Sequence, residues 1–164
     1  MRKAFTMIEL IFVIVILGIL AAVALPKFLG VAQQAHEANL KSFVGTLNRS
    51  VGPTVWSKAI SADGTGSVAA LKGKDQNLSS YVDIPKEFGT DADANLTQYC
   101  NSSSQFQAIL EANESVAGKN YVVVCRDGNS SNSLKFGLLK VNSLSGVTLG
   151  STVNGGECIA GECQ

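Results

Sequence analysis

Residues 7–25 read MIELIFVIVILGILAAVAL, nineteen positions with a single charged side chain, Glu9. About 20 apolar residues, at 1.5 Å each, cross the roughly 30 Å hydrocarbon core of a bilayer, so this stretch predicts a membrane-spanning helix. A buried core helix is the alternative, but helices of that kind rarely stay apolar for this length. We therefore expect a protein anchored by one long amino-terminal helix.

The charges on either side of this stretch predict its orientation. Arg2 and Lys3 precede it, no acidic residue does, and the next basic residue is Lys27. By the positive-inside rule, the amino terminus lies in the cytoplasm and the chain after Lys27 lies outside. A cleaved secretory signal is the alternative; its cleavage site would lie among the small residues at 21–24, behind an apolar run longer than such signals use.

Glu9 is a carboxylate inside the apolar stretch. On insertion scales an acidic side chain in a membrane span costs about 2.5–3.5 kcal/mol, so it usually serves a function or a partner. Because Glu9 lies near the start of the span, contact with lipid headgroups is one interpretation. Pairing with a positive group of another chain is the other.

The residues around this stretch resemble a known family. The segment KAFTMIEL at 3–10, the apolar run and ALPKF at 24–28 are similar to type IV pilins and to the pseudopilins of type II secretion. In that family a membrane peptidase removes a short basic leader and methylates the new amino terminus, while the apolar helix stays on the mature protein. Ala4 departs from the pattern, because the family normally has Gly there.

The resemblance implies roles for the first residues. Residues 1–4 would form the leader, the prepilin peptidase would cleave between Ala4 and Phe5, and Phe5 would carry the methyl group. Glu9 would then pair with the terminal amine of Phe5 on a neighbouring subunit during assembly. An unpaired carboxylate among packed helices is costly, so this pair would set register more than it would add stability.

The chain is expected to have three parts: the leader, a transmembrane and assembly helix over 5–26, and a periplasmic or extracellular head over 27–164. The sequence of the head predicts an α+β fold. Pro26 would permit a kink or local unwinding of the helix. Apolar residues at three- and four-residue steps predict an amphipathic continuation over 31–58, kinked or ended at Gly52-Pro53. This helix should pack on a small antiparallel sheet.

We expect an irregular connection over 59–98, with the sheet after it. The segment 121–125, YVVVC, is strongly β-branched, and a polar loop separates it from 134–141, as in a hairpin. A weaker strand is expected over 106–110 and a further edge strand within 144–153. The tail from residue 154 is expected to be irregular.

Four cysteines in an exported domain predict disulfides, and four cysteines allow three pairings. We expect Cys100–Cys125 and Cys158–Cys163, the second closing a small carboxy-terminal loop. Zinc is the alternative, but no Cys-x-x-Cys pair is present and His36 is the one histidine.

Calcium is a weaker candidate ligand, and no cofactor is expected. Asp91 and Asp93, and separately Asp127 and Asn129, offer oxygen atoms at short spacing. Neither pair has the glycine and the distal glutamate of an EF-hand loop. Polar turns of this composition also form without metal.

The charge balance and the motifs argue against two classes of function. The chain has 13 basic and 13 acidic residues, a balance that argues against nucleic-acid binding through bulk charge, and no catalytic motif stands out. With the resemblance to pilins, which implies a structural subunit, we expect no enzyme. Before assembly the subunit would span the bacterial inner membrane with its amino terminus in the cytoplasm. It would then self-assemble into a helical type IV pilus-like fibre in the periplasm or at the cell surface.

Its expected partners are further copies of itself, the prepilin peptidase and an inner-membrane assembly platform. Three alternatives stay open: a major pseudopilin of a type II secretion system, a minor pilin for adhesion or DNA uptake, and a monomer anchored by one helix. DNA uptake would need a local basic patch, for which Lys72, Lys74 and Lys86 are the candidates.

Overall fold

The computed structural model describes residues 6–89, 94–112 and 119–163, without the side chains of 28–30, 32 and 33. The chain divides into two compact units, Met1–Glu37 and Ala38–Gln164. Each unit is described by itself below. Helix α1, Met7–Thr46, contributes residues to both.

The first unit consists of the apolar part of α1. Among the described residues, one helical segment is long and apolar enough to cross a membrane: Met7–Lys27, with a mean hydropathy of 3.0. Pro26 lies inside α1, where its ring removes one backbone hydrogen bond without ending the helix.

The second unit begins with the amphipathic end of α1. The helix changes at Thr46 to one wide π-helical turn, η1 (Leu47–Val51), and continues as α2 (Gly52–Asp63). Pro53 thus lies in the first turn of α2, directly after the π-helical turn. The predicted end at Gly52-Pro53 is wrong, because Val51 and Gly52 both keep right-handed helical angles, and the helix ends later, at Gly64, with φ of 77°.

The connection to the sheet consists of short helical turns. Apolar side chains in or next to these turns are buried, so the segment is fixed to the core although it is irregular. The buried residues are Val68, Leu71, Leu78, Phe88 and Leu96. The turns are η2 (Val68–Ala70), η3 (Gly73–Gln76), η4 (Leu78–Ser80), η5 (Lys86–Phe88) and α3 (Leu96–Tyr99).

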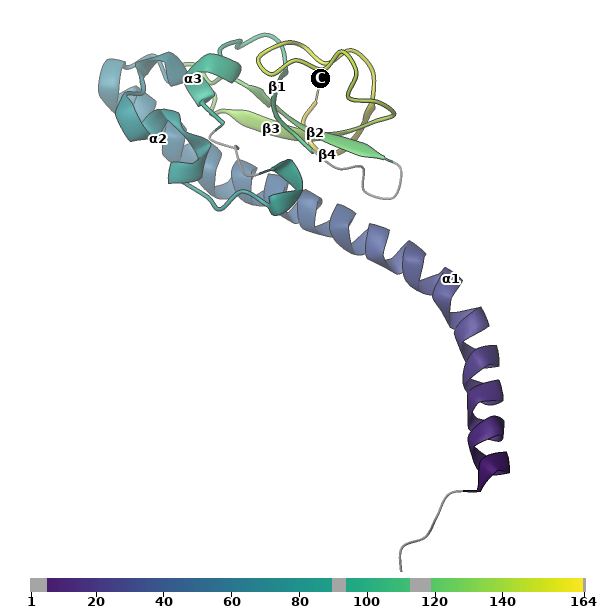
Figure 1. Cartoon of the computed structure of the whole chain (residues 1–164). Helices are drawn as coiled ribbons and strands as arrows, with labels where there is room; N and C mark the ends of the chain where they lie inside the picture. Colours follow the sequence, from purple (N-terminus) through teal and green to yellow (C-terminus); the bar gives the residue numbers. More distant parts are fainter. Residues whose placement is uncertain (1–5, 90–93, 113–118, 164) are drawn as a thin grey trace, which may run out of the picture. The chain divides into compact units, whose positions relative to one another are not determined.

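The sheet is a four-stranded antiparallel meander in the order β1-β2-β3-β4 (Figure 1). Its strands are β1 (Gln107–Glu111), β2 (Asn120–Arg126), β3 (Lys135–Val141) and β4 (Glu157–Gly161). The first three confirm the sequence-based prediction, and so does the class, a long helix with a small antiparallel sheet.

The prediction of an edge strand in 144–153 is wrong. That segment is a series of turns, with Gly146 and Gly150 at positive φ, and one isolated bridge joins Thr152 to Gln107. The edge strand comes instead from the tail, where β4 pairs with β3. Positive φ interrupts an extended strand, which explains why 144–153 turns although it is apolar in part.

The sheet is buried on both faces. One face, with Tyr121, Val123 and Cys125 of β2, packs in a core with the buried side of α1, η1 and α2. The other face, with Val122 and Val124, is covered by four apolar side chains of the loop over 142–156: Leu144, Val147, Leu149 and Val153. Burial on both faces explains the unbroken apolar sequence of β2.

Candidate functional site

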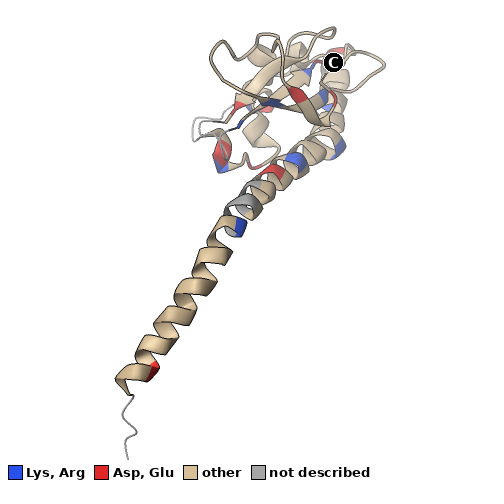
Figure 2. Ribbon diagram, turned by 90° about the vertical axis from the view of Figure 1, so that its right-hand side faces the viewer, with Lys and Arg blue, Asp and Glu red and all other residues tan. Residues whose placement is uncertain are grey.

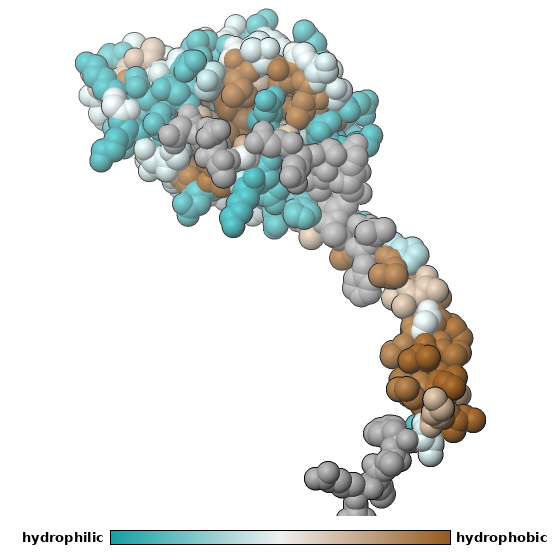
Figure 3. Space-filling model, in the orientation of Figure 1, coloured by the Kyte–Doolittle hydropathy of each residue, from teal (hydrophilic) through white to brown (hydrophobic). Residues whose placement is uncertain are grey.

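The largest exposed apolar surface of the described residues lies on α1. Fifteen large hydrophobic side chains between Met7 and Val31 are exposed, with exposed fractions from 41% at Ile16 to 84% at Met7. Figure 3 shows this segment as almost continuously brown. A helix that is apolar all round requires lipid or other helices as its surroundings. This surface is therefore built for contact outside the chain itself.

Glu9 is the acidic residue of this surface. Its backbone N–H donates to the carbonyl oxygen of Thr6 at 3.1 Å, in the first turn of α1, and its side chain is exposed. Figure 2 shows the apolar segment without blue, and with red only near its start. The positive end of the helix dipole favours a carboxylate in this turn. Glu9 thus presents a negative charge at the amino-terminal end of an apolar helix.

The expected cleavage and methylation positions, Ala4 and Phe5, lie outside the described residues. Their roles, and the pairing of Phe5 with Glu9, stay predictions. Pro26 lies within α1, as described above, and its role in assembly stays a prediction too.

The structure brings the four cysteines together in two pairs. Cys100 joins Cys125 across the buried core, with Cα atoms 5.7 Å apart. Cys158 joins Cys163 at 5.9 Å between Cα atoms and closes the segment that contains β4. Within that closed segment, Glu162 binds Arg126 at 3.2 Å and Lys135 at 3.1 Å. The tail is therefore fixed both covalently and by charge.

The calcium candidates that the structure describes have other partners. Asp127 is buried, and its carboxylate accepts hydrogen bonds from Ser67 Oγ (2.5 Å), Val68 N (2.9 Å) and Gly128 N (2.7 Å). Asn129 Oδ1 accepts from two backbone amides of its own loop. Asp91 and Asp93 lie outside the described residues. Among the residues described, no group of three or more His, Cys, Asp or Glu is placed to hold a metal ion.

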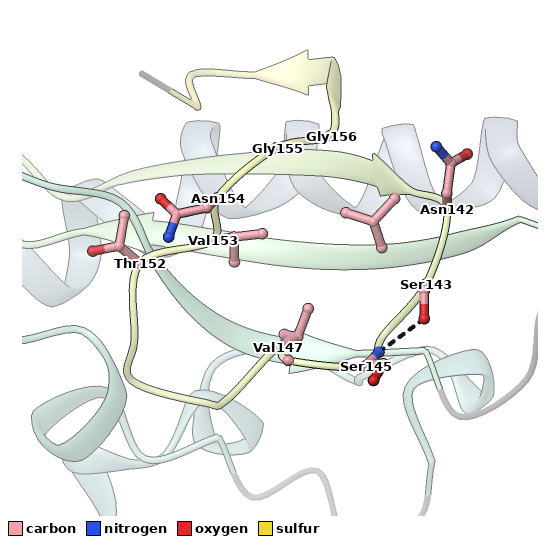
Figure 4. Close-up of a pocket in the computed structure, with 11 residues that line it drawn as sticks. Asn142, Ser143, Ser145, Val147, Thr152, Val153, Asn154, Gly155 and Gly156 are labelled. Atoms are coloured by element: carbon pink, nitrogen blue, oxygen red, sulfur yellow. Dashed lines mark hydrogen bonds between the residues drawn. The ribbon is translucent and has the colours of Figure 1, made fainter.

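A hollow of about 300 Å³ lies between the end of β3 and the covering loop (Figure 4). Asn142, Ser143, Thr152 and Asn154 line it together with Gly155 and other neutral residues, and Ser145 N donates to Ser143 Oγ at 3.0 Å. The lining has no ionisable side chain. It therefore offers hydrogen bonds from neutral groups, but no ionisable acid or base for catalysis.

Comparisons with known proteins concern the amino-terminal segment. The model for the prokaryotic N-terminal methylation motif matches residues 1–25. A relative, the type IV narrow pilus major component PilA5 of Thermus thermophilus, is 55% identical over 38 residues, which are 23% of this chain and 33% of that protein. The match thus spans about a third of the length of that relative. No solved structure matches this chain.

The two matches support a type IV pilin-like family for this chain. They agree with the fold, a long apolar amino-terminal helix and a four-stranded antiparallel sheet with the helix end packed in its core. The leader motif and the apolar helix fit a membrane-anchored precursor and an extracellular fibre. The family model covers residues 1–25, which include most of the exposed apolar side chains of α1.

Proposed function

We propose that this chain is a structural subunit of a type IV pilus-like fibre, and that the Met7–Lys27 segments of neighbouring subunits pack together in it. The observation that carries the proposal is the exposure of apolar side chains on all sides of that segment. In the precursor, lipid covers these side chains, and in the fibre other helices do. Lipid tails and apolar helices are similar surroundings, so one surface serves both states.

Assembly then follows removal of the leader. The prepilin peptidase cleaves between Ala4 and Phe5 and methylates the new terminus, and the assembly platform extracts the subunit. The carboxylate of Glu9 pairs with the terminal amine of Phe5 on a neighbour. The exposed position of Glu9 in the first turn supports this pairing, because a second chain can reach it. Leaving a charge unpaired among packed helices costs more than a pair contributes, so the pair selects the register.

The test is the intact mass of the protein in filaments sheared from the cells that produce it, together with the mass of its amino-terminal peptide. Apart from any group added to the head, the expected mass lacks Met1–Ala4, carries one added methyl group and is four hydrogens below the reduced chain, because two disulfides are formed. An uncleaved mass that stays with the membrane contradicts the proposal. A processed mass in the membrane, absent from the sheared fraction, identifies a pseudopilus subunit instead.

Substitutions at Glu9 test the pairing separately from processing. Glu9→Ala removes the carboxylate, and we expect normal processing but little fibre. Glu9→Asp is the matched control, since it keeps the charge and should retain much of the assembly. Equal amounts of fibre from the wild type and Glu9→Ala rule out a role of this carboxylate in register.

A further inference from the structure

Six asparagines in this chain stand two positions before a serine or threonine, with no proline between, which is the pattern of N-linked sugar attachment. They are Asn48, Asn77, Asn95, Asn101, Asn113 and Asn129. Four of the six also have an acidic residue two positions earlier, although 13 of 164 residues are acidic and random placement would give fewer than one such case. This regularity is not a consequence of composition.

The fold distinguishes among these asparagines by what their side chains already bind. Asn48 uses both ends of its amide on the backbone of Phe136. Asn95 is half-buried, and its Oδ1 accepts from the hydroxyl of Thr97, the motif's own third residue. These two asparagines are therefore committed to the fold.

Asn77 and Asn101 are also constrained. Asn77 is half-buried and forms a bridge with Asn95. Asn101 is exposed, but its Nδ2 donates to the carbonyl of Gln98 at 3.4 Å and its Oδ1 accepts from Gln107 at 3.0 Å. Asn113 lies outside the described residues.

Asn129 differs from Asn77 and Asn95 in being exposed, and from Asn48 and Asn101 in that no hydrogen bond from its amide nitrogen is present in the described part of the chain. It lies in the loop between β2 and β3, and Asn129, Ser130 and Ser131 are all exposed. Its Oδ1 accepts from Ser131 N and from Asn132 N, both at 2.9 Å. Within the described part of the chain, no hydrogen bond from its Nδ2 is present. The residue that would receive a sugar is thus exposed, and its amide nitrogen donates to no group among the described residues.

The loop that carries Asn129 is held firmly on its inner side. The carbonyl oxygen of Asn129 accepts from Trp56 Nε1 at 2.8 Å. Two residues earlier, the buried carboxylate of Asp127 binds Ser67 and Val68, as described above. These contacts involve the backbone of Asn129 and the side chain of Asp127. A change or modification of the Asn129 side chain therefore leaves them in place.

We propose that Asn129 is a site of N-linked glycosylation, with a sugar chain carried on a membrane polyprenyl diphosphate as the donor. Nδ2 attacks the anomeric carbon, the new C–N bond forms, and the bond from that carbon to the diphosphate oxygen breaks. The lipid diphosphate leaves, and the amide proton passes to a base of the transferring enzyme. This inference rests on the proposed function only in placing the head outside the cytoplasm, where a lipid-carried donor of this class would reach it.

The test uses protein purified from the cells that produce it, reduced and digested with trypsin. Cleavage after Arg126 and Lys135 gives the peptide DGNSSNSLK, residues 127–135, in which Asn129 is the one asparagine that fits the pattern. We expect a mass increase of a sugar chain, placed on Asn129 by fragmentation that keeps side-chain modifications. A bare peptide, or sugar placed on a serine, overturns the proposal.

Variants on the same loop sharpen the result. Asn129→Gln and Ser131→Ala should each abolish the mass increase, whereas Ser131→Thr should keep it. Asn132→Gln is the matched control, because Asn132 lies on the same loop without the pattern and its loss should change nothing. Retention of the sugar in Asn129→Gln overturns the proposal. Near-ultraviolet circular dichroism of each variant shows that the head is folded.

The same digest separates this inference from the proposed function. Its amino-terminal peptide reports leader cleavage and methylation at Phe5. A methylated terminus with a bare Asn129 overturns the glycosylation site alone. An intact leader with sugar on Asn129 overturns the fibre proposal and leaves the modification site standing.

Discussion

Asn48 of η1 binds the backbone of Phe136 in β3 with both ends of its side-chain amide. Its Nδ2 donates to the carbonyl oxygen at 2.8 Å, and its Oδ1 accepts from the amide nitrogen at 2.9 Å. In an antiparallel sheet, a residue of the neighbouring strand binds the N–H and the C=O of one residue in the same way. The carbonyl oxygen of Phe136 also accepts from Glu162 N, just after β4, at 3.1 Å, so it is the amide nitrogen of Phe136 whose partner the helix side chain supplies.

Removing this side chain should destabilise the head. In Asn48→Ala the amide nitrogen of Phe136 loses its partner, and we expect the free energy of unfolding to fall by about 1–3 kcal/mol. The measurement is urea unfolding of the full chain in detergent, followed by the fluorescence of Trp56. Asn39→Ala is the control, because Asn39 is exposed on α1. Equal midpoints for the two variants would show that the amide contributes nothing.

The two disulfides should contribute unequally. Cys100 and Cys125 are 25 residues apart and fully buried, whereas Cys158 and Cys163 are 5 residues apart. Loop-closure entropy gives about 3–4 kcal/mol for the longer loop and about 2 kcal/mol for the shorter. Paired Cys→Ala variants, compared by thermal unfolding, should therefore lose more stability at Cys100/Cys125. The reverse order contradicts this account.

Asp127 should make stability depend on pH in acid. Burial raises the pKa of Asp127 above its ordinary value of 3.8, against hydrogen bonds from Ser67, Val68 and Gly128 that lower the pKa. The folded chain then binds the proton more tightly than the unfolded chain, so this contribution is complete below 3.8 and is lost as pH rises through the folded pKa.

Asp127→Asn removes that titration and keeps the shape of the side chain. We expect the difference in unfolding free energy between the wild type and this variant to shift in favour of the variant as pH rises from about 3 to 6. Asp83→Asn, at an exposed aspartate, is the control. A difference that stays constant over this range refutes the prediction.

Gly137 should tolerate no side chain. A Cβ placed there would collide with the carbonyl oxygen of Glu162, in the segment closed by the Cys158–Cys163 disulfide. Gly137→Ala should therefore cost about 1–3 kcal/mol and raise hydrogen exchange in β4. Gly45→Ala is the control, since nothing lies within 4 Å of its added Cβ. Unchanged exchange in β4 would contradict the close approach.

The elements predicted from the sequence are those with a local pattern. The amphipathic end of α1 has one buried face, and the β-branched run of β2 is buried on both faces. β4 has no such pattern: its sequence ECIAG contains a glycine and a cysteine, and its pairing with β3 depends on a disulfide and on the space at Gly137. Contacts between residues distant in the sequence determine that β4 forms, and the local β-propensity of its residues does not.

The functional residues divide in the same way. Glu9 is recognisable because an acid within an apolar run is rare, whatever the fold around it. Asp127 is different, because its partners Ser67 and Val68 lie about 60 residues earlier, and spacing within its own loop suggested a metal ligand instead. The two hydrogen bonds between Asn48 and Phe136 join residues that are 88 positions apart, and neither local sequence predicts them.

The loop over 142–156, which covers the outer face of the sheet, is built from a stretch of chain separate from the helices on the other face. Its inward residues hold it in place, while Ser145 and Gly146 at a turn are exposed. Replacements at that turn leave the helix-packed core untouched. A foreign peptide spliced between Ser145 and Gly146 would therefore be displayed on every copy of the head, and this turn is the natural position for an epitope or affinity tag.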